Sequence, residues 1–454
     1  MNSFRPIDVG ALRSSFAGPV IAPDEAGWDR ARQTFNLTID QRPALIALAQ
    51  DARDVASAVR FANARGMRVA PQAGGHNAGP LGDLSSTLLL KTSAMSGFTV
   101  NPAARNARVE AGVKWGAVCD ATSPHGLAPL SGSARDVSVV GYSLGGGIGW
   151  LGRKHGLQCN AITAIELVTA DGTMLRVDHD DEPELFWALR GGGGSFGVVT
   201  AIEFDLFPVS DIYAGALLFP FERASEVFHA WHEWALMAPD EVTATAKLLQ
   251  LPPLPEIPEP LRGNSFAAMQ FAILGDEAFG RELIAPLRAI GPSIDTVEMI
   301  DPVGLSFLAM DPEDPLPYVA DGRVYGDMPS DGFASFVEHA GPGSGSPLAM
   351  AELRLAGGAL DRSHDMHGVR DSIVGSYVSF MVGPVMAPGA EEAARAAIER
   401  IRSSIAIYEV GRYANFSETP TQPERFHGDR RTMRLRSLRE EWDPQRVLHA
   451  NHPL

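Results

Sequence analysis

A helical repeat of apolar residues precedes the first glycine-rich loop of the chain. Four apolar residues fall at i, i+3, i+4 and i+7, namely Val55, Ala58, Val59 and Ala62. This spacing places them on one face of an α-helix. Gly66 follows where a left-handed residue commonly ends a helix. With strands expected at 44–48 and 67–71, the chain begins with a β-α-β unit.

Further periodic stretches predict a second, larger set of elements. We expect strands at 87–90, 107–113, within 160–172 and at 198–207, and helices at 115–122 and 184–191. Beyond Pro208 we expect strands at 266–274, within 347–360 and at 376–382, and helices at 276–290, 391–405 and 433–442. Residues 248–263 are rich in proline and predict an extended connector or loop tip. The part after Pro208 therefore indicates helices over an antiparallel sheet, an α+β arrangement.

Residues 347–360 alternate in a way that separates the two faces of one strand. Met350, Glu352 and Arg354 share one face, and Ala351, Leu353 and Leu355 share the other, which is fully apolar.

Three glycine-rich loops carry the strongest signal for a ligand. In Val69–Gly82, Gly74 and Gly75 precede His76, and paired glycines let successive backbone N–H groups form a nest for an anion. Taken alone, this loop could equally be a tight turn with a surface histidine. Residues 191–194 are four consecutive glycines, which packing does not explain, so this loop is expected to pass close to a cofactor or turn sharply against it.

The third loop, residues 147–152, matches the glycine spacing of a Rossmann fingerprint. Gly147, Gly149 and Gly152 spell GxGxxG, and Asp171 follows 19 residues later. The motif, however, lies a third of the way along the chain and not in its opening β-α-β unit. Because a second glycine-rich loop already exists at Gly74, we favour a pyrophosphate held between two loops.

Composition excludes several classes of function. The 454 residues carry a net charge of −17, which argues against nucleic acid because phosphate contacts need clustered Lys and Arg. The two cysteines, Cys119 and Cys159, exclude a disulfide framework and a Cys-based metal site, and we expect no metal. No stretch reaches transmembrane length, and the N-terminus lacks the pattern of a signal peptide, so we expect a cytoplasmic protein without a membrane partner.

Several ordered motifs together resemble one family. The segments QAGGHN, SLGGGIGWLGRKHGL, IELVTADG, FWALRGGGGSFGVVT, YANF and REEWDPQRVLHANHPL occur in this order. They resemble the FAD-linked oxidases of the berberine bridge enzyme and 6-hydroxy-D-nicotine oxidase type, in the vanillyl-alcohol oxidase and p-cresol methylhydroxylase superfamily. The resemblance covers roughly residues 16–208 and 408–454 well, and the middle only loosely.

The resemblance implies a fold and a cofactor. It implies a two-domain α+β fold in which residues 1–208 bind FAD, residues 209–407 bind substrate, and residues 408–454 return to the first domain. It also implies that His76 carries FAD covalently on its 8α-methyl carbon. The remaining residues expected at the cofactor are Gln72, Ala73, Gly74, Gly75, Asn77, Gly141, Gly145, Gly146, Gly147, Gly149, Ile162, Gly194, Ser195, Val199 and Asn415.

Two departures from the family pattern shape the expected chemistry. Ala134 stands where many relatives attach FAD a second time through cysteine, so we predict a single histidyl bond and no cysteinyl link. Phe416 stands where relatives often carry a tyrosine that accepts a proton. As substitutes we rank Glu352, then Tyr413, then Tyr377. Glu352 comes first because partial burial raises the pKa of a carboxyl toward neutrality. An ion pair between Glu352 and Arg354 is the structural alternative, and Arg354 joins these candidates for the active site.

We therefore expect an oxidase that transfers hydride from a small organic substrate to FAD and passes the electrons to O2, giving H2O2. An alcohol, a sugar, an amine or a secondary-metabolite intermediate all fit as substrates. A flavin dehydrogenase with another electron acceptor, and a binding protein that has lost the chemistry, are the alternatives. We expect a monomer or a homodimer.

Overall fold

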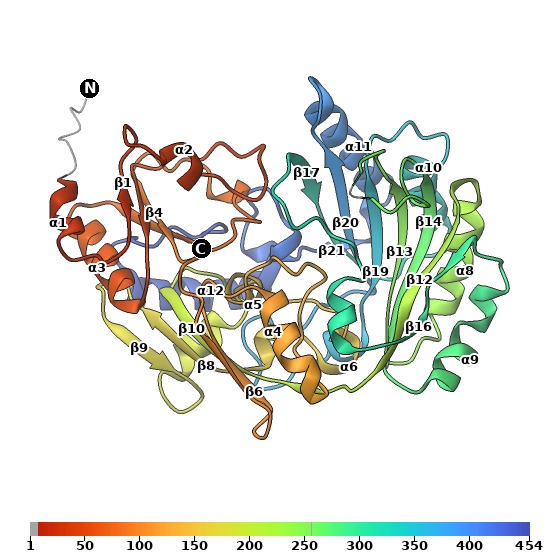
Figure 1. Ribbon diagram of the computed structural model, residues 1–454, viewed down its shortest axis with the longest axis horizontal. Helices are drawn as coiled ribbons and strands as arrows, with labels where there is room; N and C mark the ends of the chain where they lie inside the picture. The colour runs from red at the N-terminus through yellow and green to blue at the C-terminus, as the bar shows by residue number, and fades with distance from the viewer. Residues whose placement is uncertain (1–7, 256) are drawn as a thin grey trace.

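The computed structural model describes residues 8–255 and 257–454, and Figure 1 shows two lobes side by side. Residues 1–7, which belong to the expected first domain and to the N-terminal stretch judged free of a signal peptide, lie outside the described residues. So does Glu256, within the proline-rich segment 248–263. Among the described helices, none combines the length and the apolar character that crossing a membrane requires.

The first lobe begins with a four-stranded sheet of order β1-β2-β4-β3, in which β2, β4 and β3 are parallel. Its elements are α1 (Val9–Arg13), β1 (Val20–Ile21), α2 (Trp28–Ala31), β2 (Leu45–Leu48), α3 (Ala52–Asn63), β3 (Arg68–Gln72) and β4 (Thr87–Lys91). The predicted face of α3 is fully buried, and Gly66 has the expected positive φ of 63°. The expected β-α-β start is confirmed.

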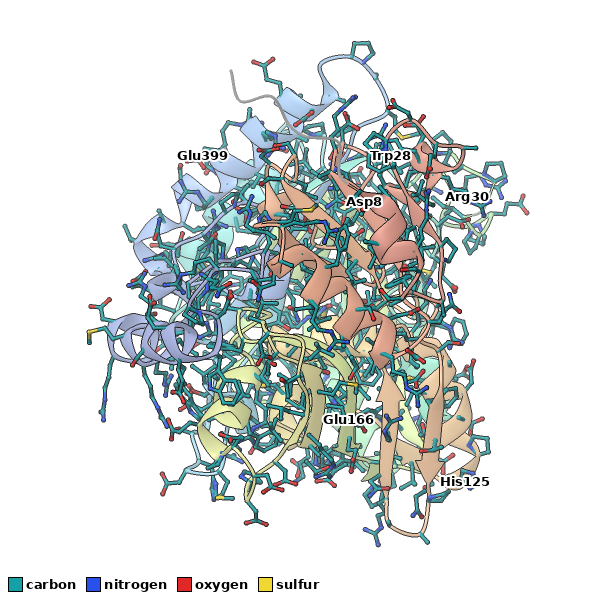
Figure 2. All side chains as sticks on the ribbon, turned by 90° about the vertical axis from the view of Figure 1, so that its left-hand side faces the viewer. Asp8, Trp28, Arg30, His125, Glu166 and Glu399 are labelled. Carbon is teal, nitrogen blue, oxygen red and sulfur yellow. The ribbon has the colours of Figure 1, made fainter. Side chains whose placement is uncertain are left out.

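A second sheet of the same lobe is antiparallel, with five strands in the order β5-β6-β10-β8-β9. These strands are β5 (Phe98–Asn101), β6 (Asn106–Glu110), β8 (Ile162–Val168), β9 (Met174–Val177) and β10 (Val198–Asp205). The accompanying elements are α4 (Trp115–Thr122), β7 (Leu127–Ala128), α5 (Val139–Leu144), α6 (Gly152–His155), α7 (Pro183–Leu189) and β11 (Phe207–Pro208). Figure 2 views this lobe end-on, with Asp8 and Trp28 near the top and Glu166 of β8 below them.

The second lobe is built on a ten-stranded sheet whose main path is β15-β12-β14-β13-β19-β20-β18-β21, with β16 paired to β12 and β17 to β20. The strands are β12 (Ile212–Pro220), β13 (Val242–Gln250), β14 (Ser265–Ile273), β15 (Ile294–Asp295), β16 (Glu298–Ile300), β17 (Tyr318–Asp321), β18 (Val324–Tyr325), β19 (Met350–Leu355), β20 (Tyr377–Pro384) and β21 (Glu409–Gly411). The helices are α8 (Ala224–Ala235), α9 (Glu277–Arg288), α10 (Ser330–Ala340) and α11 (Ala390–Ser404). In Figure 1, α8 and α9 lie at the right-hand side of this lobe, and α10 and α11 lie near its top. The expected α+β architecture is confirmed.

Strand β19 shows how this sheet faces its two neighbours. Ala351, Leu353 and Leu355 join the apolar core that α8, α10 and α11 share with the sheet. Arg354, on the opposite face, lies over the ring of Trp150 in the first lobe, with 5.6 Å between the guanidinium carbon and the ring centroid. The alternation predicted from sequence therefore directs Arg354 toward the contact between the lobes.

The C-terminal part of the chain leaves the large sheet after β21 and returns to the first lobe. Helix α12 (Glu424–Trp442) is longer than the predicted 433–442 and kinks at Gly428, which has φ 70°. Leu435 and Leu438 of α12 pack in the core of the five-stranded sheet. Short 3-10 turns complete the elements, at Gly79–Leu81, Ser123–His125, Gln158–Asn160, Phe221–Arg223, Pro302–Ser306, Gly358–Asp361, Ala406–Tyr408 and Ala414–Phe416.

Candidate cofactor and active site

A cavity of about 430 Å³ lies where the two lobes meet. One wall is formed by the glycine-rich loops of the first lobe, the opposite wall by β19, β20 and Tyr318 of the large sheet, and a third by the returning C-terminal segment. A volume of this size falls in the usual range for cofactor and substrate sites.

The loop after β3 contributes a continuous stretch of this wall. The six residues expected there, Gln72, Ala73, Gly74, Gly75, His76 and Asn77, all line the cavity. The ring of Phe35 stacks on the imidazole of His76 with 3.9 Å between the centroids. Gly75 has φ +80°, and a β-carbon at Gly74 would press on the imidazole at 3.0 Å, so both glycines are needed for this turn.

His76 has a close acidic neighbour that the sequence analysis did not single out. Its Nε2 lies 2.8 Å from Oδ2 of Asp136, a short ion-pair contact whose angle is not that of a hydrogen bond. The Asp136 side chain is only 4% exposed and lines the same cavity. Because Asp136 lies 60 residues away in an irregular segment, no periodicity in the sequence connects the two.

Helix α5 and the GxGxxG loop after it contribute only part of the cavity wall. Gly141 and Gly145 line the cavity, whereas Gly146, Gly147 and Gly149 lie behind it. The GxGxxG stretch runs between α5 and α6 and follows no parallel strand, so it does not form a Rossmann turn.

Behind this loop, the side chain of Tyr413 supports the backbone of the loop through hydrogen bonds. Its hydroxyl accepts hydrogen bonds from the backbone N–H groups of Gly147 and Ile148, both at 2.9 Å. The side-chain amide of Asn415 donates a third, at 2.8 Å. Burial outweighs these bonds and raises the pKa of Tyr413 to about 12. Asn415 lines the cavity, and Tyr413 does not.

The four-glycine loop faces the cavity along its whole length, since Gly191 to Gly194 all line it. A β-carbon at Gly193 or Gly194 would meet no protein atom within 4 Å, so both positions face open space. The other residues expected nearby lie deeper: Ser195 is fully buried, and Val199 and Ile162 belong to the core of the five-stranded sheet.

The residues ranked as proton acceptors lie away from the cavity wall. Glu352 is 2% exposed, between Nζ of Lys247 at 2.8 Å and Nη2 of Arg354 at 3.0 Å. Burial alone would raise the pKa of Glu352, but the charges of Arg354 and Lys247 outweigh it and hold the pKa below its usual value. The ion pair considered as an alternative is thus present, and Arg354, its partner, does line the cavity.

Tyr377 lies in the interior of the second lobe. Its hydroxyl is 3.2 Å from Nδ1 of His232 on α8, and its ring packs edge-on against Phe333. Burial raises the pKa of Tyr377 to about 12. The large sheet and its helices enclose it, and it does not reach the cavity.

Glu418 is a cavity residue that sequence reasoning missed. It follows the YANF motif, lines the cavity, and its Oε2 is buried without a hydrogen-bond partner. Burial and the nearby negative charge of Asp321 raise the pKa of Glu418 to about 8. A carboxyl group with a pKa near neutrality can exchange a proton with a bound molecule.

The two cysteines are not part of this site. Burial raises the pKa of Cys119 to about 11 and that of Cys159 to about 12, so both stay thiols at neutral pH. Ala134, which stands where the family resemblance would place a cysteine, lines the cavity. No group of three or more His, Cys, Asp or Glu side chains in residues 8–255 and 257–454 is arranged to hold a metal.

The residues of the cavity fit a nucleotide cofactor such as FAD. Glycine loops enter from two sides, where phosphates and a flat ring need close backbone approach. Buried polar atoms on the wall lack partners within the described chain, among them Oδ1 of Asn77, Oε2 of Glu418 and Nδ1 of His427. Since unpaired buried polar atoms are costly, a polar ligand that bonds to them is the simplest explanation.

Comparison with known sequences agrees. Residues 43–178 match the FAD binding domain family. The chain is 26% identical over 453 residues to the FAD-linked oxidoreductase YgaK of Bacillus subtilis, described as uncharacterized, covering 96% of both chains. It is 37% identical over 193 residues to (R)-6-hydroxynicotine oxidase of Paenarthrobacter nicotinovorans, which is only 42% of either chain.

Solved structures share the whole fold. 6-Hydroxy-D-nicotine oxidase from Arthrobacter nicotinovorans superposes with a TM-score of 0.81 at 24% identity, over 96% of this chain and 98% of that one. BBE-like 1 from Physcomitrella patens gives 0.84 at 20%, over 98% of both. A glucooligosaccharide oxidase from Acremonium strictum, studied for its 6-S-cysteinyl, 8α-N1-histidyl FAD, gives 0.83 at 21%, over 99% of this chain and 100% of that one. At these identities the likeness establishes the fold.

Proposed function

Because the chain is an FAD-linked oxidoreductase with the fold of the vanillyl-alcohol oxidase and p-cresol methylhydroxylase superfamily, we propose that it is an oxidase carrying FAD on His76. The observation that carries the proposal is the shared cavity. His76 and the glycine loops of the first lobe form one wall of it, and Arg354 of the second lobe forms part of the opposite wall. Bound FAD would supply the redox chemistry, accepting a hydride and passing electrons to O2 to give H2O2.

A single histidyl attachment is the form we propose. The imidazole of His76 reaches the cavity, whereas Cys119 and Cys159 do not line it. At position 134 the wall carries alanine, which offers no nucleophile. These three observations support a link through His76 without a cysteinyl bond.

The wall opposite the glycine loops is suited to a small substrate with an apolar body and a polar group. Met350, Phe380, Val382 and Phe416 provide apolar surface, and Arg354 lies among them. The guanidinium carbon of Arg354 is 5.7 Å from the ring centroid of Phe416. Alcohols, sugars, amines and secondary-metabolite intermediates remain the proposed classes, with an oxygen or anionic group directed at Arg354.

Removal of a hydride requires that the substrate also lose an O–H or N–H proton. We propose that Arg354 stabilises the negative charge that develops as this proton leaves, while Glu352 holds the guanidinium in place. Of the carboxyl groups discussed, Glu418 combines access to the cavity with a pKa of about 8, so it is the proposed proton acceptor. Since the described residues of one chain line the cavity, the scheme needs no second copy.

The test compares wild type with His76→Ala. Wild-type protein should be yellow, keep its colour after acid precipitation, and show FAD mass on the peptide that contains His76. The alanine variant should release its FAD on denaturation. Colourless wild-type protein with no affinity for FAD would instead indicate a binding protein that has lost the chemistry.

The substrate class is tested by mixing the protein with alcohols, sugars and amines and following bleaching near about 450 nm, where oxidised flavin absorbs. Peroxide formed in step with bleaching identifies an oxidase. Bleached flavin that O2 does not reoxidise, but a quinone does, would identify a dehydrogenase.

A further inference from the structure

We infer that Asp136 is a positioning residue that prepares Nδ1 of His76 for its covalent bond to FAD. The inference rests on the proposed function, because it concerns how the proposed link forms. It adds a residue that none of the three glycine-rich loops contains.

The imidazole of His76 is held from two directions. Its Nε2 meets Oδ2 of Asp136 at 2.8 Å, and its face stacks on Phe35 at 3.9 Å and an interplanar angle of 20°. A carboxylate at one ring nitrogen and an aromatic ring against the face together restrict rotation of the imidazole. Nδ1, in contrast, has no hydrogen-bond partner in the described chain. It is also absent from the buried polar atoms that lack a partner, so it is not fully enclosed by protein.

Asp136 itself is rigidly supported. The residues on either side accept hydrogen bonds from the start of α4: Val137 O from the N–H of Trp115 at 3.0 Å, and Arg135 O from the N–H of Gly116 at 2.8 Å. The neighbouring Arg135 side chain turns away to Asp120 at 2.8 Å. The only ion pair of Asp136 among the described residues is therefore the one with His76, and its Oδ1 is buried without a partner.

The position of Asp136 favours Nδ1 as the nucleophilic nitrogen. Even without hydrogen-bond geometry, the negative charge of a carboxylate 2.8 Å from Nε2 favours the tautomer with the proton on Nε2, which leaves the lone pair on Nδ1. As Nδ1 forms a bond, the imidazole gains positive charge, and the Nε2 proton can pass to Asp136. The carboxylate thus both selects the attacking atom and offsets the charge that develops.

The reaction balances with O2 as the oxidant. Nδ1 bonds to the methyl carbon at position 8 of FAD, one C–H bond of that methyl breaks, and its electron pair reduces the ring system. One proton leaves the methyl carbon and a second leaves Nε2. O2 then takes two electrons and two protons to give H2O2, which restores the oxidised cofactor, now attached.

The test measures attachment separately from binding. Full-length chain is produced flavin-free in riboflavin-starved cells and mixed with FAD, and the covalent product is read as flavin fluorescence in the denatured protein band. Non-covalent binding is measured by titration before attachment proceeds. Asp136→Asn should bind FAD nearly as well as wild type but attach it about 10- to 100-fold more slowly, since a charge-assisted contact is lost.

A matched control and a chemical rescue separate positioning from general damage. Glu166→Gln removes a carboxylate that lies outside the cavity and pairs with Arg108 at 2.7 Å, and it should attach FAD at the wild-type rate. Asp136→Ala should be slow, and added formate should accelerate it by occupying the carboxylate position, which a purely structural loss would not allow.

Each outcome decides the matter. Attachment by Asp136→Asn at the wild-type rate overturns the inference, as does a folded Asp136→Ala protein that formate does not accelerate. If the Asn variant does not fold, Asp136→Glu replaces it, and attachment below about a tenth of the wild-type rate then counts against the carboxylate's role. Wild-type protein that binds FAD but never attaches it refutes the covalent link itself, which is a failure of the proposed function.

Discussion

A β-carbon at position 145 would overlap the side-chain Oδ1 of Asn415. Asn415 is fixed there because its amide donates to the backbone carbonyl of Tyr142 at 2.9 Å and to the hydroxyl of Tyr413 at 2.8 Å. The glycine at 145 and the asparagine of the YANF motif, 270 residues apart, are therefore a matched pair.

Gly145→Ala should lower the stability of the protein. To make room for the added methyl group, the side chain of Asn415 must move and lose its two hydrogen bonds. We expect a loss of about 1–3 kcal/mol in the free energy of unfolding, the usual range for overpacking. Urea unfolding of the flavin-free chain measures it.

Gly194→Ala is the paired control for that variant. Its added methyl group would face the open cavity, with no protein atom within 4 Å. Stability should change little, while affinity for FAD should fall. Equal losses of stability in the two variants would contradict the assignment of Gly194 to the cofactor wall.

Glu352→Gln should be strongly destabilising, whatever its effect on turnover. The carboxylate compensates two cations, Lys247 and Arg354, whose side chains are 3% and 6% exposed. Removing one partner from a buried charge group typically costs about 3–5 kcal/mol. Thermal and urea unfolding check this. Glu391→Gln, which breaks an exposed pair with Arg395, should change stability by less than about 0.5 kcal/mol.

The proposed acceptor Glu418 predicts a pH dependence. A proton acceptor works in its deprotonated form, so the rate of flavin reduction should rise with pH through about 8, the pKa that burial gives Glu418. Glu418→Gln should reduce the rate and remove this rise, which stopped-flow bleaching at several pH values measures. Asp311→Asn should keep the rise; if it is lost there as well, the titration belongs to another group.

Ala134→Cys tests the other attachment point. Because Ala134 lines the cavity, a thiol at this position would face the cofactor directly. The double variant His76→Ala/Ala134→Cys should retain FAD through denaturation, whereas His76→Ala alone should not. Peptide mass spectrometry distinguishes the two, and release of FAD from both variants would place residue 134 out of reach of the ring.

The sequence predicted those features that depend on local pattern. The repeat of Val55, Ala58, Val59 and Ala62 predicted the buried face of α3, and the alternation in β19 predicted that Arg354 and the apolar core residues lie on opposite faces. Consecutive glycines at 191–194 predicted a loop that approaches the cavity. In each case neighbouring residues carry the information, because helix and strand periods act over a few positions.

The features that the sequence did not predict depend on contacts between residues far apart in the chain. The strand pattern indicates only that Glu352 is a partly buried carboxylate. The three-dimensional structure shows that Lys247, on the adjacent strand β13, neutralises its charge. Glu418 acquires its raised pKa from burial by segments that no short pattern connects. Asp136 likewise meets His76 only because two irregular loops end at the same cavity.

The segment from Pro302 to Tyr318 links the stability of the contact between the lobes to ligand binding. It belongs to the second lobe, yet Ser306 accepts from Arg135 at 2.7 Å, Asp311 from Ser133 at 2.7 Å, and the hydroxyl of Tyr318 donates to His76 O at 3.4 Å. A ligand that contacts both walls favours the docked arrangement of the lobes by the difference between its binding free energies for docked and separated lobes. Cofactor binding and docking of the two lobes are thus coupled equilibria, so the loaded chain should hold its lobes together more firmly than the flavin-free chain does.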